Sequence, residues 1–253
     1  MPDKGTNKKI IHVEGGETPS AARETRPYGP GGEDRGKAKS LRLFAVLSWI
    51  VAIGFEIGAI VLLKKPPVNM TGLIILIVAD LIFAVVGSLL WKKANKLDPA
   101  SEREKFKFFV QNQLGAIISI IAFLPLVLLI LTDKNLDKKQ KGIAGAVAVV
   151  AMLAASIMGI EFNPASVEQY AEQTAQVESL NNGLNHVYWT KFGSSYHLYS
   201  DCSYINTNRT DEIFEGTVAQ ARELKNITDL CDRCEGRARK EKGLEGAPEI
   251  PEQ

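Results

Sequence analysis

The chain has 253 residues, of which 45% are hydrophobic, and a formal net charge of +1. This length allows one or two ordinary domains, but the averages hide an uneven distribution. Apolar residues concentrate between Phe44 and Ile160, while both ends of the chain are polar. This distribution excludes a uniformly soluble chain and indicates a membrane half joined to a soluble half.

Residues 1–40 are rich in Gly, Pro, Lys, Glu and Arg and contain few large apolar side chains beyond Ile10, Ile11, Val13 and Tyr28. This composition predicts a disordered N-terminal tail. A cleaved signal peptide requires an apolar core of about 7–15 residues near the start of the chain. Residues 1–40 contain none, so we expect the first hydrophobic helix to be retained as an anchor.

Four apolar runs follow, and each is long enough to cross a bilayer core of about 30 Å as a helix. They are apolar on all sides, which is not the pattern of a soluble bundle with polar outer faces. The sequence therefore predicts a mainly α-helical fold with a four-helix transmembrane domain over residues 41–160. Its expected spans are residues 44–63, 73–91, 114–132 and 143–160.

The distribution of Lys and Arg near the spans predicts the orientation, because cytoplasmic loops carry an excess of both. Ten lie on the side of the N-terminus and of the loop between the second and third spans, and six lie on the opposite side. We therefore expect a multi-pass protein of the cell membrane with cytoplasmic N- and C-termini.

Two acidic residues, Glu56 and Asp80, lie within the first two spans. In antiparallel helices rising about 1.5 Å per residue, both carboxyls fall at a similar depth and can meet. No Lys, Arg or His lies within any span to neutralise them. They are candidates for an intramembrane proton or cation site. The alternative is a structural role, as neutral acids hydrogen-bonded between helices.

Small residues recur at helical spacing in two spans. Gly54 and Gly58 form a Gly-x3-Gly step, and Ala151, Ala155 and Gly159 form a ridge in the fourth span. Both patterns are typical of close helix packing in membranes.

Residues 161–186 are polar and predict a helical linker. Residues 187–242 then predict a small α+β module, beginning with two short aromatic strands joined by a Gly turn. A helix is expected at residues 215–225, packing Val218, Ala221 and Leu224 against these strands. Residues 243–253 are expected to be a disordered tail.

The module contains all three cysteines of the chain, Cys202, Cys231 and Cys234, and His197 precedes the first by five positions. Three Cys and one His make a complete tetrahedral zinc shell, in which a Cys-x2-Cys turn supplies two thiolates. Metal ligation would also supply folding energy to a module of fewer than about sixty residues. We therefore predict a structural Zn²⁺ ion held by these four residues.

The order Tyr196-His197, Cys202-x-Tyr204, a helix, and Cys231-x2-Cys234 resembles the small Ada-like zinc-binding domain. Such domains occur as C-terminal appendages of many bacterial membrane and secreted proteins. In Ada repair proteins the related domain has four cysteines, one of which accepts a methyl group. Here His197 takes the first ligand position, which argues against methyl transfer. The four spans in turn resemble uncharacterised bacterial four-helix membrane proteins.

Other interpretations of the cysteines are a redox Cys-x2-Cys pair, a disulfide and a catalytic zinc. The first lacks a βαβ pattern, the second leaves one cysteine over, and the third requires an open coordination position. Nucleic-acid binding is not expected, because residues 187–242 contain nine basic and nine acidic residues where a basic excess is usual.

The favoured function is a non-enzymatic membrane protein that displays a zinc module to a protein partner, as a sensor or scaffold in the lipid bilayer. The alternative is a small cation or proton transporter or channel component that uses Glu56 and Asp80. A third hypothesis, ranked last, is an Ada-like methyl acceptor or nuclease accessory.

Overall fold

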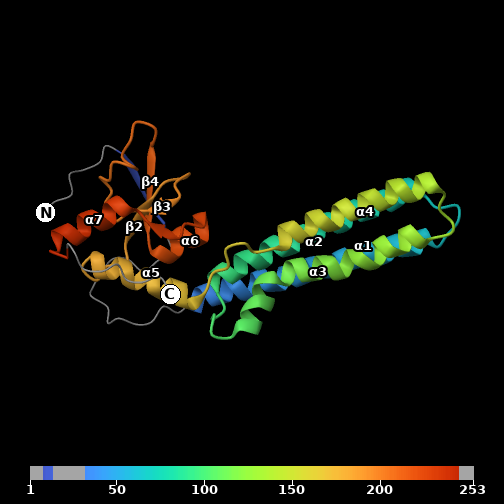
Figure 1. Cartoon of the computed structure of the whole chain (residues 1–253), viewed down its shortest axis with the longest axis horizontal. Coiled ribbons are helices and arrows are strands. Elements are labelled where there is room, and N and C mark those ends of the chain that lie inside the picture. Colours follow the sequence, from blue (N-terminus) through green and yellow to red (C-terminus); the bar gives the residue numbers. More distant parts are fainter. Residues whose placement is uncertain (1–7, 14–31, 245–253) are drawn as a thin grey trace. The chain divides into compact units, whose positions relative to one another are not determined.

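The computed structural model describes residues 8–13 and 32–244. The chain divides into two compact units, one formed by Pro30–Ser166 and the other by the N-terminal part together with Val167–Gln253 (Figure 1). Residues 32–40 were expected to belong to the disordered N-terminal tail but are helical, because the first long helix already begins at Gly32. Residues 1–7, 14–31 and 245–253, which make up most of the two expected tails, lie outside the described residues.

The first unit consists of four long antiparallel helices, all apolar enough to cross a membrane. Each contains one of the predicted spans, which confirms their number and order. The fourth span was expected to reach Ile160, but the helix ends at Gly159 and Ile160 is its C-cap residue. The helices are α1 (Gly32–Leu63), α2 (Met70–Leu97), α3 (Lys105–Thr132) and α4 (Lys138–Gly159). Polar caps start two of them: Asn69 accepts a hydrogen bond from the Gly72 amide, and Asp137 forms a capping box with Gln140.

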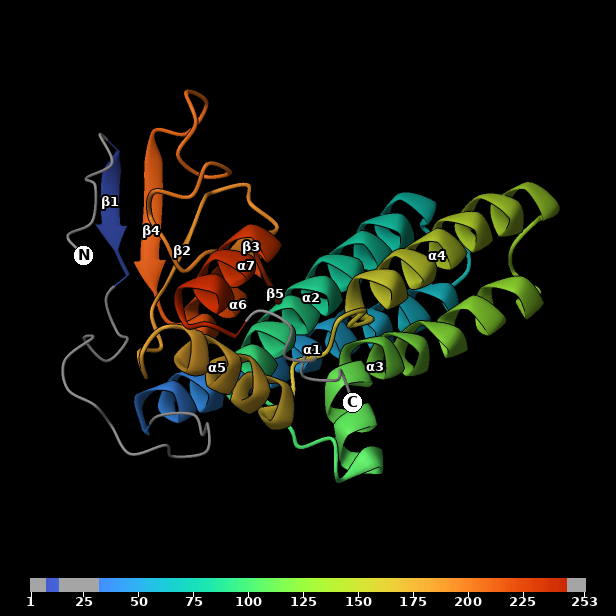
Figure 2. The ribbon, with the colours of Figure 1, turned by 60° about the vertical axis from the view of Figure 1, so that its left-hand side comes forward.

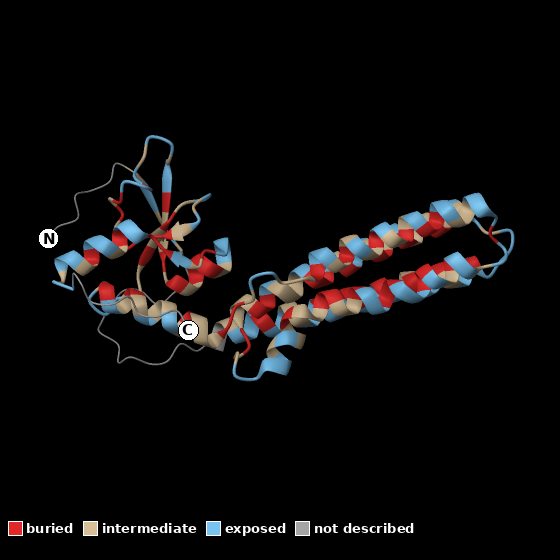
Figure 3. Ribbon diagram, in the orientation of Figure 1, coloured by how far each residue is buried: buried red, intermediate tan, exposed pale blue. Residues whose placement is uncertain are grey.

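Buried side chains line the inner faces of the four helices, and exposed residues cover their outer faces (Figure 3). The most extensive helix contacts join α1 to α2 and α3 to α4. The predicted small-residue ridge of α4 is buried, and at Gly159 a Cβ atom would lie 2.5 Å from the Ala116 nitrogen. The Gly-x3-Gly step of α1 is different, because nothing lies within 4 Å of a Cβ at Gly54.

One end of the bundle carries a layer of polar contacts that the sequence did not reveal. Arg42 of α1 donates to the Asp98 carboxylate at 2.7 Å and to the Asp98 carbonyl at 2.8 Å. Lys92 donates to the carbonyl of Ile160 at 2.8 Å, and the Trp91 indole donates to the Gln111 carbonyl at 2.7 Å. These contacts join the ends of all four helices.

The second unit contains a three-stranded sheet in the order β1-β4-β2 (Figure 2). Its strands are β1 (Lys9–His12), β2 (Val187–Trp189) and β4 (Glu212–Gly216). β1 is parallel to β4, with Ile10 opposite Ile213, and β2 is antiparallel to it. A second, parallel pair joins β3 (Ser195–Tyr196) to β5 (Asp229–Leu230). Around a core that includes Trp189 and Tyr196 lie three helices, α5 (Val167–Leu180), α6 (Val218–Lys225) and α7 (Asp232–Glu241).

Three expectations about this unit need correction. Lys9–His12 is a strand, although it belongs to the segment expected to be disordered, because pairing with β4 satisfies its backbone. The 161–186 linker contains α5, but this helix packs on α6 and α7 and buries Tyr170, Val177 and Leu180, so it is part of the module. In α6, Val218 and Ala221 are buried as expected, whereas Leu224 is 56% exposed.

Candidate functional site

The four predicted metal ligands converge in the second unit. The ligand atoms of His197, Cys202, Cys231 and Cys234 all lie within 4.8 Å of one another, and all four residues are buried. The His197 Nδ1 and Cys234 Sγ atoms are 3.6 Å apart. A tetrahedral zinc site with bonds of about 2.0–2.3 Å places its ligand atoms roughly 3.5–3.8 Å from one another. The cluster therefore has the donor set of a metal site of this kind, and the His197–Cys234 pair has its spacing; the other ligand atoms, within 4.8 Å, are close enough to converge on one ion.

His197 and Cys202 come from the segment that follows β3. The backbone amides of Tyr188 and His197 donate to each other's carbonyl groups at 2.7 Å, which holds His197 beside β2. A tight turn follows, in which the Cys202 amide donates to the Tyr199 carbonyl at 3.2 Å. The Asn206 amide donates to the Cys202 carbonyl at 2.8 Å. These bonds fix the backbone on both sides of Cys202 and with it the position of the thiol.

Cys231 and Cys234 lie at the start of α7. The Cys231 amide donates to the Tyr196 carbonyl at 2.9 Å, which ties the Cys-x2-Cys turn to β3. Cys231 caps α7 and Cys234 lies in its first turn. The positive end of a helix dipole favours the thiolate form of a cysteine, which is the form that binds a metal.

The electrostatics of the cluster also favour ionised sulfur. A hydrogen bond with Cys234, together with one from His197, lowers the pKa of Cys202, while the same thiol pairing raises the pKa of Cys234. The pair thus loses its first proton readily and holds the second, which a bound cation would displace. The backbone groups of Tyr204 and Leu198 also hydrogen-bond to the two sulfurs, a second shell that the sequence did not predict.

A depression of about 210 Å³ adjoins the cluster, and its lining includes Cys202 and Cys234. Arg237 lies over the Tyr199 ring at 3.9 Å, donates to Asp201 at 2.8 Å and donates to Glu241 at 3.0 Å. Burial, followed by a hydrogen bond to Glu241, raises the pKa of Tyr199 to about 12. The charge of Arg237 is thus compensated within the module.

The second predicted pair, Glu56 and Asp80, lies in the first unit. Asp80 is completely buried, and neither of its carboxyl oxygens has a hydrogen-bond partner among the described residues. Glu56 is 7% exposed and interacts electrostatically with Asp80. The structure therefore brings the two carboxyls near each other, as expected. It does not show the hydrogen bonds between helices that a purely structural role would use.

All three cysteines are free thiols. No protein-family model, curated protein or solved structure gave a significant match to the chain. The resemblance to Ada-like domains therefore rests on the Tyr-His, Cys and Cys-x2-Cys motif alone.

Proposed function

We propose that this chain is an integral membrane protein in which four helices cross the bilayer and anchor a zinc module that binds a protein partner, as a sensor or scaffold without catalytic activity. The single observation that carries this proposal is the buried cluster of His197, Cys202, Cys231 and Cys234. Four protein ligands close a tetrahedral shell and leave no position for a substrate or a reactive water.

The choice of zinc follows from the donor set. Three thiolates and one imidazole are typical of structural zinc sites, whereas Mg²⁺ and Ca²⁺ take oxygen ligands. Nucleic acid is not the partner that we propose, because Arg237 and Arg239 are ion-paired within the module to Asp201, Glu241 and Glu235. Residues 187–242 as a whole contain nine basic and nine acidic residues, so the module offers no net positive charge to phosphate.

Metal analysis of the full chain purified in detergent tests the metal site. We expect about one zinc ion per chain in the wild type and a large loss in the Cys231→Ser, Cys234→Ser double variant. Ser203→Ala, beside Cys202, is the matched control and should keep its zinc. Clearly substoichiometric zinc in the wild type, or unchanged zinc in the double variant, would reject the proposal.

The pairing of β1 with β4 supports the proposed topology. β1 precedes α1 and β4 follows α4, yet the two strands are hydrogen-bonded neighbours in one sheet. Both strands must therefore lie on the same side of a membrane, which an even number of spans satisfies. The excess of Lys and Arg supports the cytoplasmic side.

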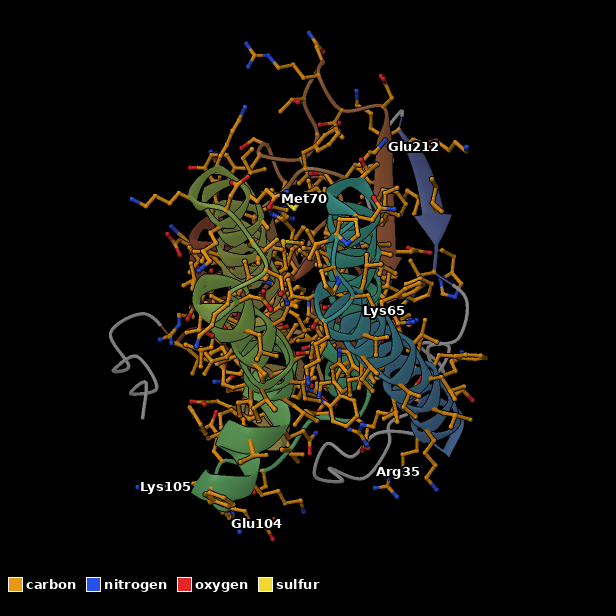
Figure 4. The ribbon with its side chains drawn as sticks, turned by 90° about the vertical axis from the view of Figure 1, so that its right-hand side faces the viewer. Arg35, Lys65, Met70, Glu104, Lys105 and Glu212 are labelled. Carbon is orange, nitrogen blue, oxygen red and sulfur yellow. The ribbon has the colours of Figure 1, made fainter. Side chains whose placement is uncertain are left out.

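Single cysteines introduced into the loops test this topology. Lys65 and Lys105 are both exposed, and Lys105 lies with Glu104 at the start of α3, pointing away from the other helices (Figure 4). A membrane-impermeant maleimide should label Lys65→Cys on intact cells. It should label Lys105→Cys only after the cells are lysed. The reverse pattern would put the module outside the cell.

A second candidate function is favoured by the Asp80 carboxyl, which is completely buried beside Glu56 without a hydrogen-bond partner among the described residues. Ionisable groups in this situation within a membrane commonly bind a proton or a cation. We therefore propose a small cation or proton transporter or channel component as the alternative. Proton and cation flux in liposomes should fall in the Glu56→Gln, Asp80→Asn double variant, and unchanged flux would reject this function.

A further inference from the structure

The four-helix unit contains a cavity of about 470 Å³, which none of the functions above requires. Side chains of α1 and α3 and Trp91 of α2 line it. Seven lining residues are aliphatic, two are the tryptophans Trp49 and Trp91, and the remaining one is Glu56. Cavities that hold drug-sized molecules have volumes of about 300–1,000 Å³ and mostly apolar walls with a few polar groups. This cavity matches that description.

The charge within the cavity has one sign. Glu56 is the acidic residue of the lining, it is more than nine-tenths buried, and its side chain makes no ion pair or hydrogen bond among the described residues. One basic group, the guanidinium of Arg42, lies over the Trp91 ring, 5.7 Å from its centroid. Arg42 is ion-paired with Asp98 at 2.7 Å, so it leaves the carboxyl of Glu56 uncompensated.

The two tryptophans add a second element of cation recognition. The rings of Trp49 and Trp91 lie 5.5 Å apart, and the Trp49 indole N–H is already hydrogen-bonded to the Ala84 carbonyl. The contribution of Trp49 to a ligand is therefore its ring and not its polar atom. Tryptophan faces attract cations, and because the Arg42 guanidinium already lies over the Trp91 ring, Trp49 offers the face that a bound cation can use.

We infer that this cavity binds a hydrophobic organic cation, whose apolar groups contact the aliphatic side chains and tryptophan rings and whose positive charge pairs with Glu56. Asp80 does not line the cavity, but it interacts electrostatically with Glu56. An inorganic cation would gain little from the apolar walls, and a neutral lipid chain would leave Glu56 unpaired. The inference is independent of the zinc module and does not require transport.

Tryptophan fluorescence of the full chain in detergent, titrated with tetraphenylphosphonium, tests the inference. Two of the three tryptophans line the cavity, and the third, Trp189, is buried in the other unit and serves as a constant background. Tetraphenylborate has nearly the same shape and the opposite charge. We expect saturable quenching by the cation and at least about tenfold weaker binding of the anion.

The Glu56→Gln variant should also bind the cation at least about tenfold more weakly. Its matched control is Glu104→Gln, which removes the same charge from an exposed position in the same unit, and it should bind like the wild type. Equal binding of cation and anion by the wild type, or unchanged binding in Glu56→Gln, would overturn the inference. If Glu56→Gln does not fold, the comparison of the two probes on the wild type still decides it. Zinc content, measured on the same samples, reports separately on the metal site.

Discussion

The Nδ1 atom of His197 lies 3.6 Å from the Sγ atom of Cys234, although 37 positions separate them in the chain. The contact forms because the Cys231 amide is hydrogen-bonded to the Tyr196 carbonyl, directly before His197. This parallel strand pairing thus delivers the histidine and the Cys-x2-Cys turn to the same point.

Replacement of His197 tests its role as a ligand. His197→Ala should weaken zinc binding by at least about 100-fold, because a ligand contributes more than the outer-shell partners whose loss costs about 10–100-fold. His197→Cys should retain much of the affinity, since four thiolates also make a complete shell. Competition with a chromophoric chelator measures both. The control is His12→Ala, and equal affinities for all three variants would exclude His197 from the site.

Removal of the metal should unfold the second unit and leave the first intact. The buried cluster that includes Trp189 and Tyr196 also contains all three cysteines, so the metal shell is continuous with the core of the module. Small modules depend on such ligation, and structural zinc contributes an apparent binding free energy of about 10–16 kcal/mol at neutral pH. After chelation, hydrogen exchange should become fast in residues 187–242 and stay slow in the four long helices. Slow exchange in both would show that the module folds without metal.

The stability of the second unit should fall in acid in part because of His186. Burial, the largest effect, lowers the pKa of His186 below its usual value, despite Glu215 nearby. The unfolded chain therefore binds this proton more readily than the folded one, and the contribution is present above about pH 6.5 and lost as the pH falls.

Thermal unfolding followed by Trp189 fluorescence measures this effect in a background of Trp49→Phe and Trp91→Phe. Between pH 7.5 and 5.5 the wild type should lose more stability than His186→Gln, because glutamine at position 186 does not titrate. Acid also displaces metal from thiolates, but that loss is common to both proteins. Identical pH profiles would contradict the prediction.

The contact of α3 with α4 should tolerate no side chain at Gly159. A Cβ atom there would lie 2.5 Å from the backbone nitrogen of Ala116, so the helices must separate. We expect Gly159→Ala to destabilise the bundle by about 1–3 kcal/mol. The control is Gly142→Ala in the same helix, where nothing lies within 4 Å and helix propensity favours Ala by about 1 kcal/mol.

Unfolding in SDS, followed by circular dichroism, measures the two glycine variants. Equal midpoints for both would show that α3 and α4 do not pack closely at Gly159.

The sequence by itself determined the number and order of the four apolar helices, because long and uniformly apolar runs can be recognised without knowledge of the fold. It also identified the four residues of the candidate metal cluster, since a Cys-x2-Cys pair with one further Cys and one His has few other uses. Helix rise alone predicted that Glu56 and Asp80 lie near each other, and the structure shows an electrostatic interaction between them.

Tertiary structure decided what depends on distant partners. Lys9–His12 has no strong signal of its own and becomes a strand because the edge of β4 is open to it. Gly54 and Gly159 both belong to small-residue patterns at helical spacing. A Cβ atom would meet a close neighbour at Gly159 but not at Gly54. The cavity of Glu56, Trp49 and Trp91 likewise needs three helices at once. Sequence spacing predicts which residues share one helix face, whereas the packing of the helices decides what that face meets.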